Sequence, residues 1–163
     1  MNPASSHNNK GLLRIVLLTG LLAGTLDISA ACVQYYINTG KNPVVVLNYI
    51  ARGLLGNDAA AGGVAVALLG LFCHYLIAFS FTFFFAWIYP KWKWMSFNRV
   101  LTAIVYGLFI WAVMNMVVVR LSRITQGVFH PGKAAVAALI LICMIGLPLS
   151  CILGRYFDKK GTV

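Results

Sequence analysis

Residues 59–89 read AAAGGVAVALLGLFCHYLIAFSFTFFFAWIY and contain no Asp, Glu, Lys or Arg. A helix of this length exceeds the ~20 apolar residues needed to cross a bilayer core about 30 Å thick. Similar apolar runs occupy about 11–36, 99–119 and 134–153. We therefore predict an all-α polytopic membrane protein with four transmembrane helices, forming a single domain over residues 1–163.

The composition excludes a soluble globular domain. Apolar residues make up 61% of the chain and charged residues 10%, against roughly 45 to 50% and about 25% in soluble domains. The net charge of +10 comes from basic residues at the ends of apolar runs, where anionic lipid headgroups favour them. We therefore expect anionic lipids as partners and no nucleic acid, because no basic stripe with interleaved aromatic residues is present.

The first apolar run has an alternative interpretation as a removable signal peptide, because Ser29-Ala30-Ala31-Cys32 resembles a lipoprotein cleavage site. The run is longer than the roughly 7 to 15 apolar residues of a signal peptide, and Asp27 interrupts it near that point. We therefore expect a retained span. The four cysteines fall within predicted spans and form no C-x-x-C pair, so no disulfide framework or thiol oxidoreductase is expected.

A short helix is predicted between the first two spans. Asn42-Pro43 is typical of an N-cap followed by proline at the first helical position, and Gly56 marks the end. A helix over about 43–55 is only ~20 Å long at 1.5 Å per residue, too short to span. We expect it to lie in the membrane interface; the alternative is a re-entrant lid over the bundle.

The distribution of basic residues predicts the orientation. An even number of spans places the head, the loop at 90–99 and the tail on one side with eight Lys and Arg, and leaves five on the other side. The positive-inside rule then places both termini in the cytoplasm.

Asp27 and His74 are the main candidates for a functional site. Each lies near the middle of a predicted span, where an ionisable group costs ~2.5 to 3.5 kcal/mol and normally faces the bundle interior or a wet cavity. We predict that they meet as a protonatable or ion-binding pair. The alternative is that each hydrogen-bonds to Thr, Ser or Asn and ties helices together.

Other polar residues extend this prediction toward the outer face. The depth of a residue in the membrane can be estimated from its position along a span. By this estimate three polar residues lie near the pair, and two lie at the outer ends of their spans. We predict a site completed by Thr25, Tyr106 and Asn115, with a wet vestibule at Gln34 and Arg120.

Small residues predict where helices pack closely. Gly20 and Gly24 form a G-x-x-x-G step, which permits close approach of a neighbouring helix. Gly63 and Gly70 lie on a similar stripe that ends at His74, and Gly146 begins another. Such stripes on several faces predict a homo-oligomer, most simply a twofold dimer.

Metal, haem and enzymatic functions have weaker support. Cys73 and His74 are adjacent and point about 100° apart on a helix, so they cannot readily share one zinc ion. One histidine lies within a span, whereas haem between helices usually takes two, so haem or metal at His74 remains an alternative and no cofactor is predicted. No G-x-S-x-G, H-E-x-x-H, Walker or G-x-G-x-x-G motif occurs, and we expect no enzyme.

The segments GLLAGTLDI (20–28), HYLIAF (74–79) and YGLFIWAVMN (106–115) resemble small four-span inner-membrane proteins of bacteria. This resemblance implies the architecture and a location in the bacterial inner membrane, and it implies no particular activity. The plan of four spans with one acid in the first is also similar to that of the small multidrug resistance exporters, which are shorter, lack the 43–55 segment and carry a glutamate in a different local sequence.

Two classes of function follow from the sequence. In the first, a small transporter or channel uses Asp27 and His74 on a transport path. In the second, a membrane scaffold or accessory subunit uses its polar residues to hold helices together. The sequence names no solute and no protein partner.

Overall fold

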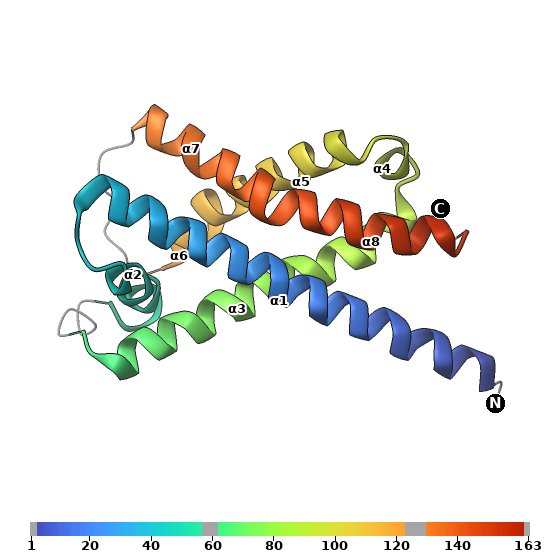
Figure 1. Ribbon diagram of the computed structural model, residues 1–163, viewed down its shortest axis with the longest axis horizontal. Helices are drawn as coiled ribbons and strands as arrows, with labels where there is room; N and C mark the ends of the chain where they lie inside the picture. Colours follow the sequence, from blue (N-terminus) through green and yellow to red (C-terminus); the bar gives the residue numbers. More distant parts are fainter. Residues whose placement is uncertain (1–2, 57–61, 123–129, 162–163) are drawn as a thin grey trace.

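The structure, a computed structural model, describes residues 3–56, 62–122 and 130–161. Within these ranges four helical stretches are long and apolar enough to cross a membrane, which confirms the predicted fold: Lys10–Thr39, Val64–Lys91, Arg99–Leu121 and Pro131–Lys159. Figure 1 shows them running along a common long direction, with both chain ends at the same end of the bundle. We call this the terminal end and the opposite one the far end.

The helices follow the predicted order. They are α1 (Pro3–Thr39), α2 (Val44–Leu55), α3 (Val64–Ile88), α4 (Trp94–Phe97), α5 (Arg99–Val113), α6 (Val119–Leu121), α7 (Pro131–Leu141) and α8 (Leu147–Lys159). A 3-10 turn, η2 (Tyr89–Lys91), continues α3, and π-helical turns interrupt the third and fourth spans at η3 (Met114–Val118) and η4 (Ile142–Gly146). Turns of this kind are frequent at functional sites.

Local sequence signals account for several helix ends. The Asn98 carboxamide accepts hydrogen bonds from the backbone N–H groups of Val100 and Leu101, at 3.0 and 3.1 Å, and so caps α5. The second span begins at Val64 and not at the predicted Ala59, because Gly62 and Gly63 hold positive φ angles of 67° and 106° ahead of it. Asn57 and Asp58, whose residue types predict a cap for this span, lie outside the described residues.

The short helix α2 confirms the prediction for 43–55. The Asn42 side chain accepts a hydrogen bond from the Val44 N–H at 3.0 Å, and α2 ends at Gly56, whose φ is 70°. Figure 1 shows α2 end-on, crosswise to the spans at the far end of the bundle. Ala51 is completely buried, so α2 is packed into the bundle and does not merely rest on it.

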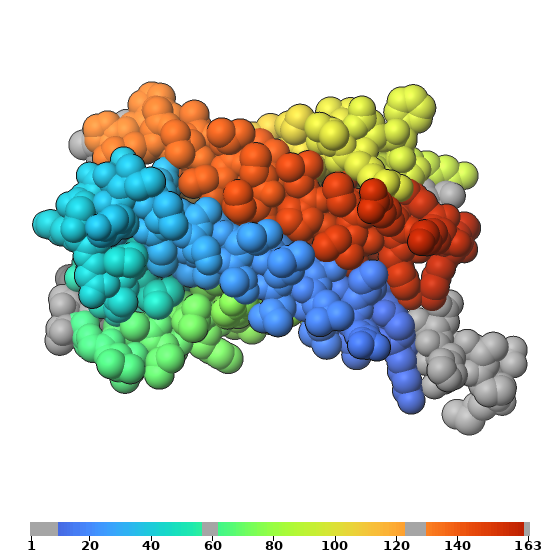
Figure 2. Space-filling view, viewed as in Figure 1, coloured from blue at the N-terminus to red at the C-terminus, as the bar shows by residue number. Residues whose placement is uncertain are grey.

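Glycines bring α1 and α3 close together, as predicted. A Cβ added at Gly20 would lie 2.7 Å from the ring of Phe79, and one added at Gly24 would lie 3.1 Å from the ring of Tyr75. On its other side α1 packs against the fourth span, and Figure 2 shows their side chains meeting along one face of the bundle. The first helix is therefore held between two neighbours.

Two of the other predicted packing glycines do not make the expected contact with α1. A Cβ at Gly70 would overlap the Leu47 carbonyl of α2, so this part of the stripe makes room for α2 and not for α1. Gly63 packs against nothing within 4 Å, so its predicted role is wrong. Gly146 does pack closely, against the Ala103 carbonyl of α5.

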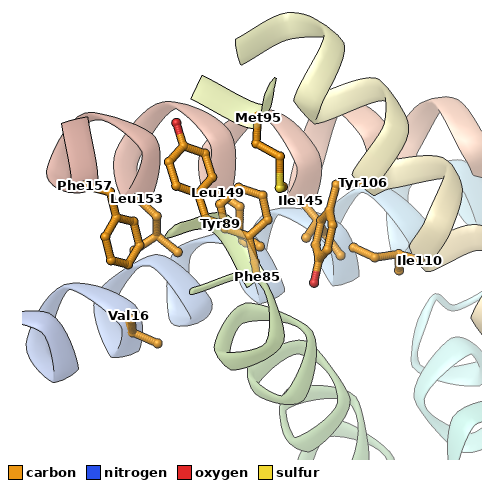
Figure 3. Packing of buried hydrophobic residues seen from close by; sticks show 11 residues of the cluster. Val16, Phe85, Tyr89, Met95, Tyr106, Ile110, Ile145, Leu149, Leu153 and Phe157 are labelled. Carbon is orange, nitrogen blue, oxygen red and sulfur yellow. The ribbon is translucent and has the colours of Figure 1, made fainter. Parts of the chain in front are cut away.

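The hydrophobic core occupies the terminal half of the bundle. Figure 3 shows rings and aliphatic side chains from every span meeting there. Phe85 lies between Tyr89 and Tyr106, with ring centroids 5.4 and 4.8 Å away. The cluster comprises Val16, Ala23, Phe85, Tyr89, Met95, Tyr106, Ile110, Ile145, Leu149, Leu153 and Phe157. We call this cluster the aromatic core; beside it α3, α4 and α5 border an apolar hollow of about 240 Å³.

A polar network joins three spans at the terminal end. Arg99 and Asp158 form an ion pair at 2.9 Å, and the Tyr89 hydroxyl donates to the same carboxylate at 3.3 Å. The Ser150 hydroxyl donates to the Arg99 carbonyl at 2.6 Å. Tyr89, Arg99 and Asp158 lie at the terminal ends of three different spans. The network therefore fixes these span ends relative to one another.

Candidate functional site

Asp27 and His74 line one cavity at about mid-depth, as the sequence predicts. Its volume is about 70 Å³, enough for water molecules. All four spans and α2 contribute to its wall, which consists of Asp27, Ile50, His74, Ile77, Ala78, Phe81, Ile110, Met114, Leu141 and Ile145. We call this the central cavity.

The two ionisable side chains share the central cavity without forming an ion pair. His74 Nε2 lies 2.8 Å from the Gly24 carbonyl oxygen. Since a carbonyl only accepts, Nε2 carries the proton and donates, which leaves Nδ1 as the basic nitrogen of the neutral ring. No ion pair within 4.0 Å joins Asp27 and His74, in contrast to Arg99 and Asp158.

The Asp27 carboxyl group is half-buried and forms no hydrogen bond with the side chains or backbone of the described residues. It is the one acid in the described part of the spans that has no such partner, because Asp158 binds both Arg99 and Tyr89. Asp27 and His74 therefore border the same cavity, and their pairing remains a prediction.

Thr25 and Asn115 do not join this site. The Thr25 hydroxyl donates to the Leu21 carbonyl at 2.7 Å and lies 2.8 Å from the Tyr75 hydroxyl, on an exposed face of α1. The Asn115 side chain is exposed and donates to the Trp111 carbonyl at 2.8 Å. Both satisfy their polar groups on their own helix and line no part of the cavity.

Tyr106 does not line the central cavity but lies next to it, on the side of the terminal end. Its ring belongs to the aromatic core, and its hydroxyl donates to the Phe81 carbonyl at 2.6 Å. Phe81 does line the cavity. Tyr106 therefore supports the cavity floor and ties α5 to α3.

Gln34 and Arg120, the residues of the predicted vestibule, are not among the residues that line the central cavity. The vestibule remains a prediction. On its far side the central cavity is bordered by Ile50 of α2. α2 therefore forms part of the wall of this site.

A larger hollow lies beside α2. It has a volume of about 390 Å³ and is bounded by α2, α3, η3 and α6. Its lining is almost wholly apolar, and we call it the lateral groove: Tyr49, Ile50, Gly53, Leu54, Cys73, Ile77, Met114, Val117, Val118, Val119, Leu121 and Ser122. Ile50, Ile77 and Met114 also line the central cavity, so these three side chains separate the two hollows.

Sequence reasoning missed the apolar members of this site. Ile50, Ile77 and Met114 belong to helices that are apolar on nearly every face, and nothing in their local sequence distinguishes them. The Arg99–Asp158 pair was also missed, although the sequence has just three acids and one of them stands in an otherwise basic tail. That isolated acid was a signal for a basic partner.

A metal centre has no geometric support in the described residues, where no three His, Cys, Asp or Glu side chains gather closely enough to hold an ion. Cys73 lines the lateral groove and His74 the central cavity. The two adjacent side chains thus face different hollows, as helical geometry requires.

Comparison of the chain with models of known families, with curated proteins and with solved structures gives no match. Function must therefore be argued from the site itself.

Proposed function

We propose that this protein is a small membrane transporter that uses Asp27 and His74 as a protonatable site. The observation that carries the proposal is an acid without a hydrogen-bond partner among the described residues, in a cavity walled by all four spans. Intramembrane ionisable groups in such positions mark ion, proton or substrate pathways.

The energies favour a functional role for Asp27 over a structural one. Placing an acid near mid-span costs ~2.5 to 3.5 kcal/mol, whereas an interhelical hydrogen bond in a membrane contributes ~0.6 kcal/mol on average. Asp27 makes no such bond within the described structure. A residue that held helices together would show that contact, as His74 does with Gly24.

The chemistry of the pair suits exchange of a proton. Neutral His74 presents Nδ1 as a base, and Asp27 can hold or release a proton beside it. The other cavity residues, from α2, α3, α5, η3, α7 and η4, carry no ionisable group. The charge of the cavity therefore depends on these two side chains and on whatever is bound with them.

The packing around the central cavity favours a transporter over a wide open channel. The aromatic core lies on its terminal side, and Ile50, Ile77 and Met114 form part of its wall beside α2. A solute larger than the cavity, whose volume is about 70 Å³, can occupy it only when part of this wall moves. The π-helical turns η3 and η4 each contribute a wall residue, Met114 and Ile145, and provide places for such movement.

The second candidate is a membrane scaffold. It is supported by three polar contacts between spans, namely His74 with Gly24, Tyr106 with Phe81 and Ser150 with the Arg99 carbonyl. A scaffold role explains those contacts. It does not offset the ~2.5 to 3.5 kcal/mol that placing Asp27 near mid-span costs.

Location, orientation and assembly complete the proposal. We infer a bacterial inner-membrane protein with cytoplasmic termini, where Lys91 over Trp87 at 3.4 Å anchors the terminal end among anionic headgroups. A homo-oligomer remains a prediction. Gly20, Gly70 and Gly146 pack against helices of the same chain, so they are not free to pack against a second copy.

The test is proton movement in liposomes that contain a pH-sensitive dye. An imposed pH gradient is applied alone and with an opposing gradient of sodium or of benzyltrimethylammonium. We expect proton flux in the wild type in at least one condition, loss of that flux in Asp27→Asn, and retention in Asp158→Asn, which removes an acid outside the cavity. Equal fluxes in the wild type and Asp27→Asn under every condition would reject transport and leave the scaffold.

A further inference from the structure

A separate apolar hollow lies between the second and third spans, near the terminal end. Its volume is about 240 Å³, and it is lined by α3, α4, α5 and Trp92, which lies just before α4. Among the described residues, none from the first or fourth span lines it. Figure 1 shows α4 and the beginning of α5 at an edge of the bundle. The hollow therefore lies at the periphery of the bundle, and we call it the terminal groove.

The terminal groove is partly open, and part of its rim borders the membrane. The rim includes Val105 and Phe109, which are 42% and 39% exposed, and Trp92 and Trp94, which are 49% and 43% exposed. The floor includes Tyr106, which is buried. Val105 and Phe109 belong to the third span, so their exposed faces contact lipid chains.

The lining of the groove suits an apolar occupant. Its two hydroxyl groups are already hydrogen-bonded, because Thr102 donates to the Met95 carbonyl at 2.7 Å and Tyr106 donates to the Phe81 carbonyl at 2.6 Å. The other lining side chains are aromatic, aliphatic or a thioether. An unfilled hollow of this kind forfeits dispersion contacts. A flexible apolar chain from the surrounding membrane can enter it and restore them.

Two lysines alternate with the tryptophans of the groove and leave positive charge at its end. Lys91 and Lys93 are both exposed. The Lys91 ammonium lies 3.4 Å from the centroid of a Trp87 ring, and because it has three N–H donors it can still bind an anion. Asp158, the acid described at this end of the bundle, is bound to Arg99. Neither lysine is thus paired with a carboxylate within the described part of the chain.

We propose that the terminal groove binds an anionic phospholipid, with one acyl chain in the groove and the phosphate bound by Lys91 and Lys93. Indole rings and lysines of this kind lie at the level of the lipid headgroups, and basic pockets beside membrane spans bind anionic headgroups. The proposal is independent of the proposed function, because the groove and the central cavity have no lining residue in common among the described residues.

Charge decides between the possible occupants. A zwitterionic phospholipid would bring its own cation beside the two lysines, and a neutral apolar molecule would leave them without a partner. A second copy of this chain is a poor match, because the sequence has three Asp and Glu against 13 Lys and Arg. An anionic phospholipid supplies both the apolar chain and the negative charge, and it is present in the membrane around the groove.

The test follows the fluorescence of Trp92 and Trp94, which line the groove. The other two tryptophans are removed by Trp87→Phe, which keeps a ring beneath Lys91, and Trp111→Phe. This parent protein is placed in phosphatidylcholine nanodiscs with increasing fractions of phosphatidylglycerol brominated on its acyl chains, because bromine quenches tryptophan on contact. We expect quenching that saturates at a low fraction, whereas brominated phosphatidylcholine should quench in proportion to its fraction.

The lysines are tested by Lys91→Gln combined with Lys93→Gln. A lysine near anionic lipid contributes about fivefold in affinity, so the double variant should raise the half-saturating fraction by about 25-fold. Lys10→Gln combined with Lys159→Gln is the matched control, because it removes the same charge from exposed positions at the terminal end. The control should leave the half-saturating fraction unchanged.

The groove itself is tested by Val105→Phe, which narrows it and should make quenching by brominated phosphatidylglycerol proportional to its fraction. Val100→Phe is the control, because it makes the same change at another exposed position of α5 that is not among the lining residues. The lysine variants alter exposed side chains alone and so provide a second, independent measurement.

Four results would overturn the proposal. Proportional quenching by phosphatidylglycerol in the parent protein would show ordinary contact with the surrounding lipid. Saturation that survives Val105→Phe would place the acyl chain elsewhere. An equal shift in the control lysine pair would assign the effect to the charge of the whole surface. Displacement by oleate as effective as by unbrominated phosphatidylglycerol would replace the phospholipid by a fatty acid.

Discussion

Replacing Gly70 by alanine should loosen α2 from α3 and open the lateral groove. The added Cβ would overlap the Leu47 carbonyl oxygen and lie 2.7 Å from the carbonyl carbon. Both contacts are with backbone, so no side-chain rotation can relieve them. A retreat of about 0.8 Å would restore an ordinary carbon–carbon contact of ~3.5 Å, and the Leu47 peptide must move farther than that because its oxygen lies closer to the added Cβ than its carbon does.

The magnitude follows from the cost of overpacking. A methyl group inserted into a well-packed interface costs about 1 to 3 kcal/mol. The cost applies while α2 is docked on α3 and vanishes when α2 moves away. The population with α2 displaced should therefore rise by about 5- to 150-fold.

The assay uses Cys73, which is half-buried three residues after Gly70 and lines the groove beneath α2. In a protein whose other cysteines are replaced by alanine, maleimide labelling reports how often α2 exposes this thiol. We expect Gly70→Ala to raise the labelling rate, with the range given above as its upper bound, because the half-buried thiol is already partly accessible while α2 is docked. Gly132→Ala is the control, because nothing lies within 4 Å of a Cβ at that position, and its labelling rate should match that of the parent protein.

Equal labelling rates in Gly70→Ala and the parent would refute the docking of α2 against α3. A rate raised equally in Gly132→Ala would show that the effect is general destabilisation and not movement of α2. Either result would also remove the structural basis for α2 as part of the wall of the central cavity.

Three further predictions follow from other contacts. Gly146→Ala should lower stability by about 1 to 3 kcal/mol, measured by thermal unfolding in detergent, because its Cβ overlaps a backbone carbonyl of α5; an unchanged midpoint would contradict the close crossing of the third and fourth spans. Arg99→Gln should cost no more than about 1 kcal/mol, because Arg99 and Asp158 are 37% and 29% exposed; a much larger shift in midpoint would show that the pair is shielded from water. A cysteine at His130 should react with an impermeant reagent in intact cells and one at Gly161 should not; the reverse pattern would invert the proposed orientation.

The sequence alone determined the elements, because their signals are local. Span length follows from runs of apolar residues, and helix limits follow from side chains such as that of Asn98, which binds the backbone two and three residues ahead. The positive φ that ends α2 needs the glycine at position 56. Close packing at Gly20 and Gly24 was also predictable, because small residues four apart lie on one helix face.

Tertiary structure alone decided which faces meet, because helices that are apolar all round carry no marker of orientation. Gly70 packs against α2, and Ile50, Ile77 and Met114 form one barrier, through contacts between elements far apart in the chain. Whether a polar side chain lies on an exposed face or in the cavity depended on whether it hydrogen-bonds to its own helix. Thr25 and Asn115 donate to carbonyls of their own helices and remain on exposed faces. Asp27 makes no such bond to its own helix and lines the cavity between helices.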